Sequence, residues 1–106
     1  MTQSAVLDIV AGTGITATHI QQPYLRVRGD GGPIDLTVNP QIAAGTTGQI
    51  LTLQGTSDTN TLKFDDGTGL SLNSGVSFSL KNGNLIQFIY DGSVWREMFR
   101  SVPAPL

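Results

Sequence analysis

Residues of the types that carry out catalysis or bind metal ions are scarce in this chain of 106 residues. His19 is the only histidine, Glu97 is the only glutamate, and there is no cysteine. A zinc site needs several His or Cys ligands, and hydrolysis by paired carboxylates needs two acids that face one another. The spacing brings no such partner to His19 or Glu97. We therefore expect no catalytic residue, no metal site and no cofactor, and interpret the protein as not being an enzyme.

Four short motifs match fragments of known binding sites, and each is explained more simply as a turn. Asp58-Thr59-Asn60 and Asp65-Asp66-Gly67 look like parts of calcium loops, but the full loop spacing with its final Glu is absent. Asp and Asn also initiate turns. Gly12-Thr13-Gly14 is not followed by a helical pattern, which a phosphate-binding loop requires. Arg28-Gly29-Asp30 matches a tripeptide of integrin ligands, but the adjoining Gly31-Gly32 favours a turn at a hairpin tip.

Most aromatic residues alternate with polar residues along their segments, which favours a place in the core over an exposed carbohydrate platform. Tyr24 is the better candidate for an exposed contact. The aromatic residues expected to be mostly core are Phe64, Phe78, Phe88, Tyr90, Trp95 and Phe99.

Short apolar runs that alternate with polar residues, separated by Gly, Pro, Asn and Asp, predict β-strands and turns along the chain. Residues 15–18 fit either a short strand or an extended arm. Asn82-Gly83 predicts a hairpin turn of type I′, because Asn and Gly tolerate a positive φ. Strands are expected at residues 5–10, 24–28, 34–38, 50–53, 62–64, 70–72, 76–80 and 85–90, with a last one around Trp95.

No segment has the 3.6-residue period of a helix, so the chain is expected to be all-β. Strands about every ten residues predict a small antiparallel β-sandwich or a jelly-roll-like domain with extended N- and C-terminal segments. Residues 1–22 are expected to form a strand or arm, residues 23–101 the sandwich module, and residues 102–106 an extended tail. Pro103 and Pro105 disfavour regular pairing in that tail.

The composition is poor in charge, with 13% charged residues against about 25% in an average protein. The net charge is −2 and there is no basic patch, which disfavours duplex nucleic acid as a partner. No stretch approaches the ~20 apolar residues of a membrane span, and no secretory signal is visible. We expect a soluble protein, synthesised in a cytoplasm, whose polar and weakly charged surface faces another protein.

Three segments together resemble a β-rich module of tailed-bacteriophage virion proteins, found in capsid decoration (cement) proteins and fibre-like proteins. They are Gly48–Thr61 (GQILTLQGTSDTNT), Asp65–Leu70 (DDGTGL), and Leu85–Tyr90 followed by Asp91-Gly92-Ser93-Val94-Trp95. The resemblance implies a homotrimeric part of the virion and carries over no catalytic residue. A chain of 106 residues that is nearly all module fits a decoration protein better than a longer fibre.

The resemblance implies a protein on the exterior of the capsid, with the major capsid protein and two further copies of itself as partners. The alternative is a tail-fibre or head-fibre domain that binds a host-surface glycan or another virion protein. The residues predicted to form protein interfaces, from position and expected exposure, are Tyr24, Arg26, Arg28, Val102, Pro103, Pro105 and Leu106.

Overall fold

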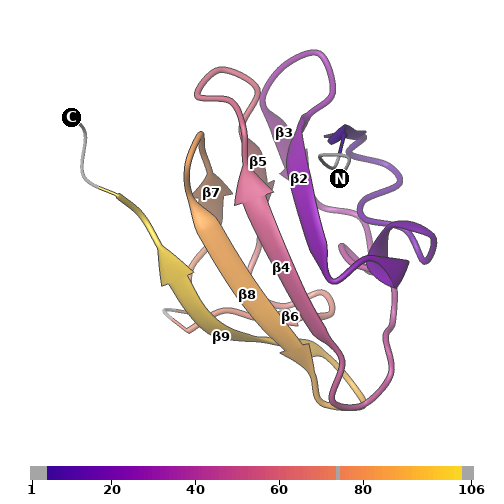
Figure 1. Ribbon diagram of the computed structural model, residues 1–106. Helices are drawn as coiled ribbons and strands as arrows, with labels where there is room; N and C mark the ends of the chain where they lie inside the picture. The colour runs from indigo at the N-terminus through magenta and orange to yellow at the C-terminus, as the bar shows by residue number, and fades with distance from the viewer. Residues whose placement is uncertain (1–4, 74, 104–106) are drawn as a thin grey trace.

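The computed structural model describes residues 5–73 and 75–103, and their regular structure is nearly all β-strand (Figure 1). This confirms the all-β prediction. The only helical turn in the described residues is the 3₁₀ helix η1 (His19–Gln21). The strands are β1 (Val6–Ile9), β2 (Tyr24–Gly29), β3 (Ile34–Leu36), β4 (Ile50–Gly55), β5 (Leu62–Phe64), β6 (Leu70–Ser71), β7 (Phe78–Leu80), β8 (Leu85–Tyr90) and β9 (Trp95–Ser101).

The strands form two mixed sheets. The main sheet has the strand order β1-β2-β4-β8-β9-β6, and the small sheet has the order β3-β5-β7. From β2 to β8 the chain alternates strictly between the two sheets. Between β2 and β8, two main-sheet strands that are successive along the chain are therefore separated by one strand of the small sheet. In Figure 1 the small sheet lies behind the main one.

The expected antiparallel arrangement is wrong for much of the fold. Four of the seven strand pairings in the described residues are parallel: β1 with β2, β2 with β4, β3 with β5, and β6 with β9. The pairings β4–β8, β5–β7 and β8–β9 are antiparallel. The alternating path explains the parallel pairs β2–β4 and β3–β5, because a chain that crosses to the other sheet returns to the first in its original direction.

The core lies between the facing sides of the two sheets. In β8, Ile86, Phe88 and Tyr90 are buried, whereas Leu85, Gln87 and Ile89 are half-buried on the other side, as a period of two requires. The rings of Phe64 in the small sheet and Phe88 in the main sheet meet edge to face, with centroids 6.2 Å apart. The fully buried side chains include Leu36, Leu51, Leu53, Leu62, Leu80 and Trp95.

Two turns expected at hairpins instead connect the two sheets. Gly29–Pro33 leads from β2 to β3, and Lys81–Asn84 leads from β7 to β8. In the second turn the Asn84 N–H donates to the Lys81 carbonyl (3.0 Å), and only Gly83 has a positive φ (+84°). That is the pattern of a type II turn, since type I′ also requires a positive φ at Asn82.

The described part of the N-terminal segment, residues 5–22, packs onto the rest of the chain. Strand β1 is the edge of the main sheet beside β2. Ile9, Ile15 and Ile20 are buried in the same core as the later strands. Ile15 forms an isolated parallel bridge with Ile42, whereas residues 17–18 are a turn that leads into η1, so residues 15–18 form neither a strand nor a fully extended arm.

Candidate protein-interaction surfaces

Strand β2 carries three of the predicted interface residues on one side of the main sheet. Leu25 and Val27 are buried against the small sheet, so Tyr24, Arg26 and Arg28 point to the opposite side. Tyr24 is 38% exposed, Arg26 is half-buried and Arg28 is exposed. The structure thus places these three residues on one side of the main sheet.

Cross-strand pairing extends this surface over the other strands. Tyr24 pairs with Thr52, Thr52 with Gln87, and Gln87 with Phe99, so one row of side chains crosses four strands. We call this side of the sheet the outer face. Its side chains are Val6, Asp8, Tyr24, Arg26, Arg28, Ile50, Thr52, Gln54, Leu85, Gln87, Ile89, Arg96, Phe99 and Ser101.

The composition of the outer face is typical of a protein interface. It holds Tyr, Phe and three of the four arginines, and it contains no Lys and no Glu. Interface cores are enriched in aromatic residues and Arg, and depleted in Lys, Glu, Asp and Ser, of which this face carries Asp8 and Ser101. Lys63 lies in the small sheet, Lys81 in the turn before β8, and the Glu97 side chain is buried.

Hydrogen bonds within the outer face hold its side chains in place. Gln87 Nε2 donates to Thr52 Oγ1 (3.0 Å), and the Tyr24 hydroxyl donates to Gln54 Oε1. A surface fixed in this way loses little side-chain entropy when a partner docks, because the side chains are already ordered. These side chains in the middle of the sheet are therefore held in place within the chain itself.

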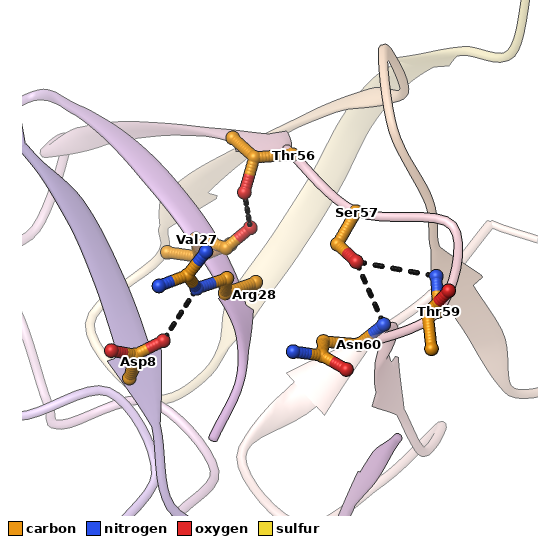
Figure 2. Close-up of polar contacts among 7 residues, drawn as sticks. All are labelled: Asp8, Val27, Arg28, Thr56, Ser57, Thr59 and Asn60. Atoms are coloured by element: carbon orange, nitrogen blue, oxygen red, sulfur yellow. Dashed lines mark hydrogen bonds and ion pairs between the residues drawn. The ribbon is translucent and has the colours of Figure 1, made fainter. Parts of the chain in front are cut away.

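The end of the outer face near β1 carries an exposed ion pair. Arg28 Nε donates to Asp8 Oδ1 at 2.6 Å, between β2 and β1 (Figure 2). The hydrogen bond and the charge of Asp8 raise the pKa of Arg28 above its ordinary value. Because Arg28 is paired with Asp8, its side chain is not free to bind as the arginine of an integrin ligand does. Gly29 is buried, and the Asp30 N–H is bound to the Ile9 carbonyl.

The loop that follows β4 closes over the same end of the sheet. Thr56 Oγ1 donates to the Val27 carbonyl (3.0 Å), which ties the loop to β2 (Figure 2). Ser57 Oγ accepts from the N–H groups of Thr59 (3.2 Å) and Asn60 (2.8 Å). These bonds explain the polar motif around Asp58 as a turn that a serine hydroxyl organises.

The second motif that resembles part of a calcium loop, Asp65-Asp66-Gly67, is also held by hydrogen bonds within the chain. The buried Gln41 accepts from the Asp65 N–H (2.9 Å) and donates to the carbonyls of Asp65 (2.8 Å) and Gly67 (3.1 Å). Asp66 Oδ1 accepts from the Leu72 N–H (2.8 Å). Among residues 5–73 and 75–103, no group of three or more His, Cys, Asp or Glu side chains is placed to hold a metal ion.

His19 has a local structural role at η1. Its Nδ1 accepts from the Thr16 N–H (3.1 Å), and its own N–H donates to Thr16 Oγ1 (3.3 Å). This reciprocal pair closes the turn that begins the 3₁₀ helix.

A second surface lies at the C-terminal end of β9, where the strand alternation breaks. Phe88 pairs with Glu97 and Gln87 pairs with Phe99, so Met98 is the extra residue of a β-bulge. The bulge leaves two consecutive apolar side chains on the surface. We call Met98 (48% exposed), Phe99 (47%) and Val102 (57%) the β9 patch.

The same bulge places Glu97 and Arg100 together on the inner side of β9. Arg100 Nε and Nη2 donate to the two carboxylate oxygens of Glu97, each at 2.7 Å. Glu97 also accepts from the Asn73 N–H (3.0 Å), and the Arg100 guanidinium lies 4.1 Å from the Phe78 ring centre. The hydrogen bond from Arg100 lowers the pKa of Glu97, and the same bond raises the pKa of Arg100.

Of the four predicted tail residues, two lie within the described part of the chain and two do not. Val102 and Pro103 are exposed at the end of β9, whereas Pro105 and Leu106 lie outside the described residues. The sequence analysis did not single out Met98. It expected Phe99 to be mostly core, which is wrong because Phe99 is 47% exposed. The available signal was the pair of adjacent apolar residues, Met98-Phe99, which breaks the alternation that begins at Trp95.

Comparison with models of protein families, with curated proteins and with solved structures finds no match to this chain. Within residues 5–73 and 75–103, no helix has the length and apolar character needed to cross a bilayer.

Proposed function

We propose that this protein is a non-enzymatic part of a tailed-phage virion, a homotrimeric cement protein that binds the major capsid protein from outside the shell. Its resemblance to the module of decoration and fibre-like proteins supports the virion role. The observation that carries the binding role is the outer face, a preorganised five-strand surface with Tyr24, Arg26 and Arg28 and without Lys or Glu.

In this proposal the two sheets are the layers of a β-sandwich. The contact between Phe64 and Phe88 across the interior supports this arrangement. The strand order departs from an antiparallel jelly roll, because β1, β2 and β4 run parallel.

The mechanism follows from symmetry and mass action. A trimer that sits where three capsid subunits meet makes each contact three times, so a weak single contact becomes strong through avidity. Bound trimer then stabilises the closed shell by an amount that depends on free trimer concentration and the dissociation constant. The β2 end of the outer face, with Tyr24 and Arg28, is the part that contacts the shell.

The first test is the absolute mass of the purified chain by light scattering. The expected mass is three times the 11.2 kDa of one chain. The second test is cosedimentation with undecorated shells of the major capsid protein. Tyr24→Ala is expected to weaken binding at least about tenfold, as loss of an aromatic interface residue does, whereas Lys63→Ala on the small sheet leaves it unchanged. Equal binding of the two variants would refute the assignment of the outer face.

One observation favours the fibre alternative. Tyr24 and Phe99 are both exposed and stand at the two ends of one cross-strand row, about 14 Å apart at the usual strand spacing. Two rings with Thr52 and Gln87 between them fit an extended glycan. A glycan array separates the two functions. Specific glycan binding that is lost in Tyr24→Ala, together with no binding to shells, would support the fibre domain.

A further inference from the structure

Asn82 is the only one of the five asparagines in this chain that is followed by glycine. It is exposed in the turn between β7 and β8. The side-chain amide of an asparagine is open to attack by the backbone nitrogen of the next residue, and a glycine there places no Cβ in the way. The pair Asn82-Gly83 therefore carries the groups needed for spontaneous deamidation.

The reaction needs only base and water as co-reactants. The Gly83 amide gives its proton to base, and its nitrogen forms a bond to Asn82 Cγ while the side-chain nitrogen leaves as ammonia. Water then opens the resulting succinimide ring at one of its two C–N bonds. One opening leaves aspartate in the ordinary backbone. The other leaves isoaspartate, in which the backbone runs through the former side chain.

In the folded protein the attacking nitrogen is engaged by β4. The Gly83 N–H donates to the Gly55 carbonyl (3.0 Å), and the Gly55 N–H donates to the Asn84 carbonyl (2.9 Å). While these bonds hold, the Gly83 amide keeps its proton and its peptide plane cannot turn toward Asn82 Cγ. Attack therefore requires the turn to separate from β4, a local opening of the kind that exposes backbone amides to solvent.

We propose that Asn82 is a deamidation site whose reaction is controlled by the two hydrogen bonds between Gly55 and the β7–β8 turn. The rate in the folded protein is then the rate in the unfolded chain multiplied by the fraction of molecules in which the turn is open. The modification records how often the turn separates from β4. This inference does not depend on the proposed virion role.

The isoaspartate product should not rebuild the native turn. It adds a methylene group to the backbone where the turn and β4 lie so close that a Cβ on Gly55 would be 2.0 Å from the Lys81 carbonyl oxygen. Each modified side chain also adds one negative charge to a chain whose net charge is −2. Molecules with isoaspartate should therefore melt at a lower temperature and separate from unmodified ones by anion exchange.

The test incubates the wild type in mildly alkaline buffer, folded and in a urea concentration that unfolds it, and follows deamidation by anion exchange and peptide mass mapping. In urea, Asn82 should be modified before the other asparagines. In the folded protein its rate should be at least about tenfold lower. Asn82→Ala should remove this product under both conditions, which confirms the assignment of the site.

Gly55→Ala tests the control by β4, with Gly32→Ala as the matched variant, since a Cβ at Gly32 meets nothing within 4 Å. Gly55→Ala should speed deamidation of the folded protein about 5–30-fold, and Gly32→Ala should leave it unchanged. If Gly55→Ala does not fold, hydrogen exchange of the wild-type Gly83 N–H decides the matter. Its protection should equal the ratio of the unfolded to the folded deamidation rate within about threefold, because both reactions need the same opening.

Two results would overturn the proposal. If another asparagine is modified first in urea, Asn82 is not the principal site. If the folded and unfolded chains deamidate at the same rate although the Gly83 N–H is protected from exchange, the hydrogen bonds to Gly55 do not control the reaction.

Discussion

Glu97 and Arg100 face the same side of β9 although they lie three positions apart along the strand. In a regular strand, residues an odd number of positions apart point to opposite sides of the sheet. The extra residue Met98 restores their common orientation, because it shifts the register between Glu97 and Phe99. The same bulge therefore accounts both for the Glu97–Arg100 ion pair on the inner side of β9 and for the exposure of Met98 and Phe99.

The ion pair is expected to contribute to stability, because the Glu97 side chain is only 1% exposed. Glu97→Gln keeps the shape but removes the charge that Arg100 and the Asn73 N–H bind. The expected loss is about 1–3 kcal/mol in the free energy of unfolding, measured by urea denaturation. Asp35→Asn is the matched control, since Asp35 and Lys63 are exposed and 3.8 Å apart. A loss no larger than that of the control would contradict this role.

Acid should destabilise the protein through Asp91 and Glu97. Hydrogen bonds from the Val94 and Ser93 N–H groups and from Arg96 lower the pKa of Asp91 from 3.8 to about 2, and the pKa of Glu97 is also lowered. A lowered pKa gives stability that is complete above the ordinary value and is lost as the pH falls through the folded-state value. Unfolding free energy should therefore fall between about pH 4.5 and pH 2.

The check for Asp91 is urea denaturation at a series of pH values for the wild type and Asp91→Asn. The variant should be less stable at pH 7 and should lose less on acidification, because its side chain does not titrate. Parallel pH profiles for the two proteins would show that Asp91 contributes nothing to the acid sensitivity.

Gly55 is a position where the fold has no room for a side chain. A Cβ atom there would lie 2.0 Å from the Lys81 carbonyl oxygen, because β4 and the turn before β8 exchange backbone hydrogen bonds at this point. Gly55→Ala should lower the free energy of unfolding by about 1–3 kcal/mol or more, seen as a lower melting temperature. Gly32→Ala, which meets nothing within 4 Å, should be neutral or slightly stabilising.

The turn between β7 and β8 gives a direct test of its type. Gly83→Ala places a side chain at a φ of +84° and should cost about 1–2 kcal/mol. Asn82→Ala should have little effect, because Asn82 has a negative φ in a type II turn. Thermal melts of both variants distinguish the turns, since a type I′ turn would make the two substitutions similarly costly.

The candidate interface was predictable in part. Tyr24, Arg26 and Arg28 alternate with Leu25 and Val27, so their common side of β2 follows from the period of a strand alone. Of the β9 patch only Val102 was predicted to lie at an interface, because Phe99 was expected to be mostly core and Met98 was not singled out. A bulge depends on how β9 is paired with β8, and that pairing is a contact between two strands that the local sequence does not encode.

The sequence by itself determined where the strands are and, outside the bulge of β9, which residues point inward, because both follow from short-range alternation and from turn residues. Ile86 and Phe88 illustrate this, since both are fully buried where the pattern predicts. Only the tertiary structure decided which sheet each strand joins, that β2 lies parallel to β4, and that the turn at Gly83 joins two sheets. Strand partners are chosen by packing across the whole core, where Phe64 meets Phe88, and no local pattern contains that information.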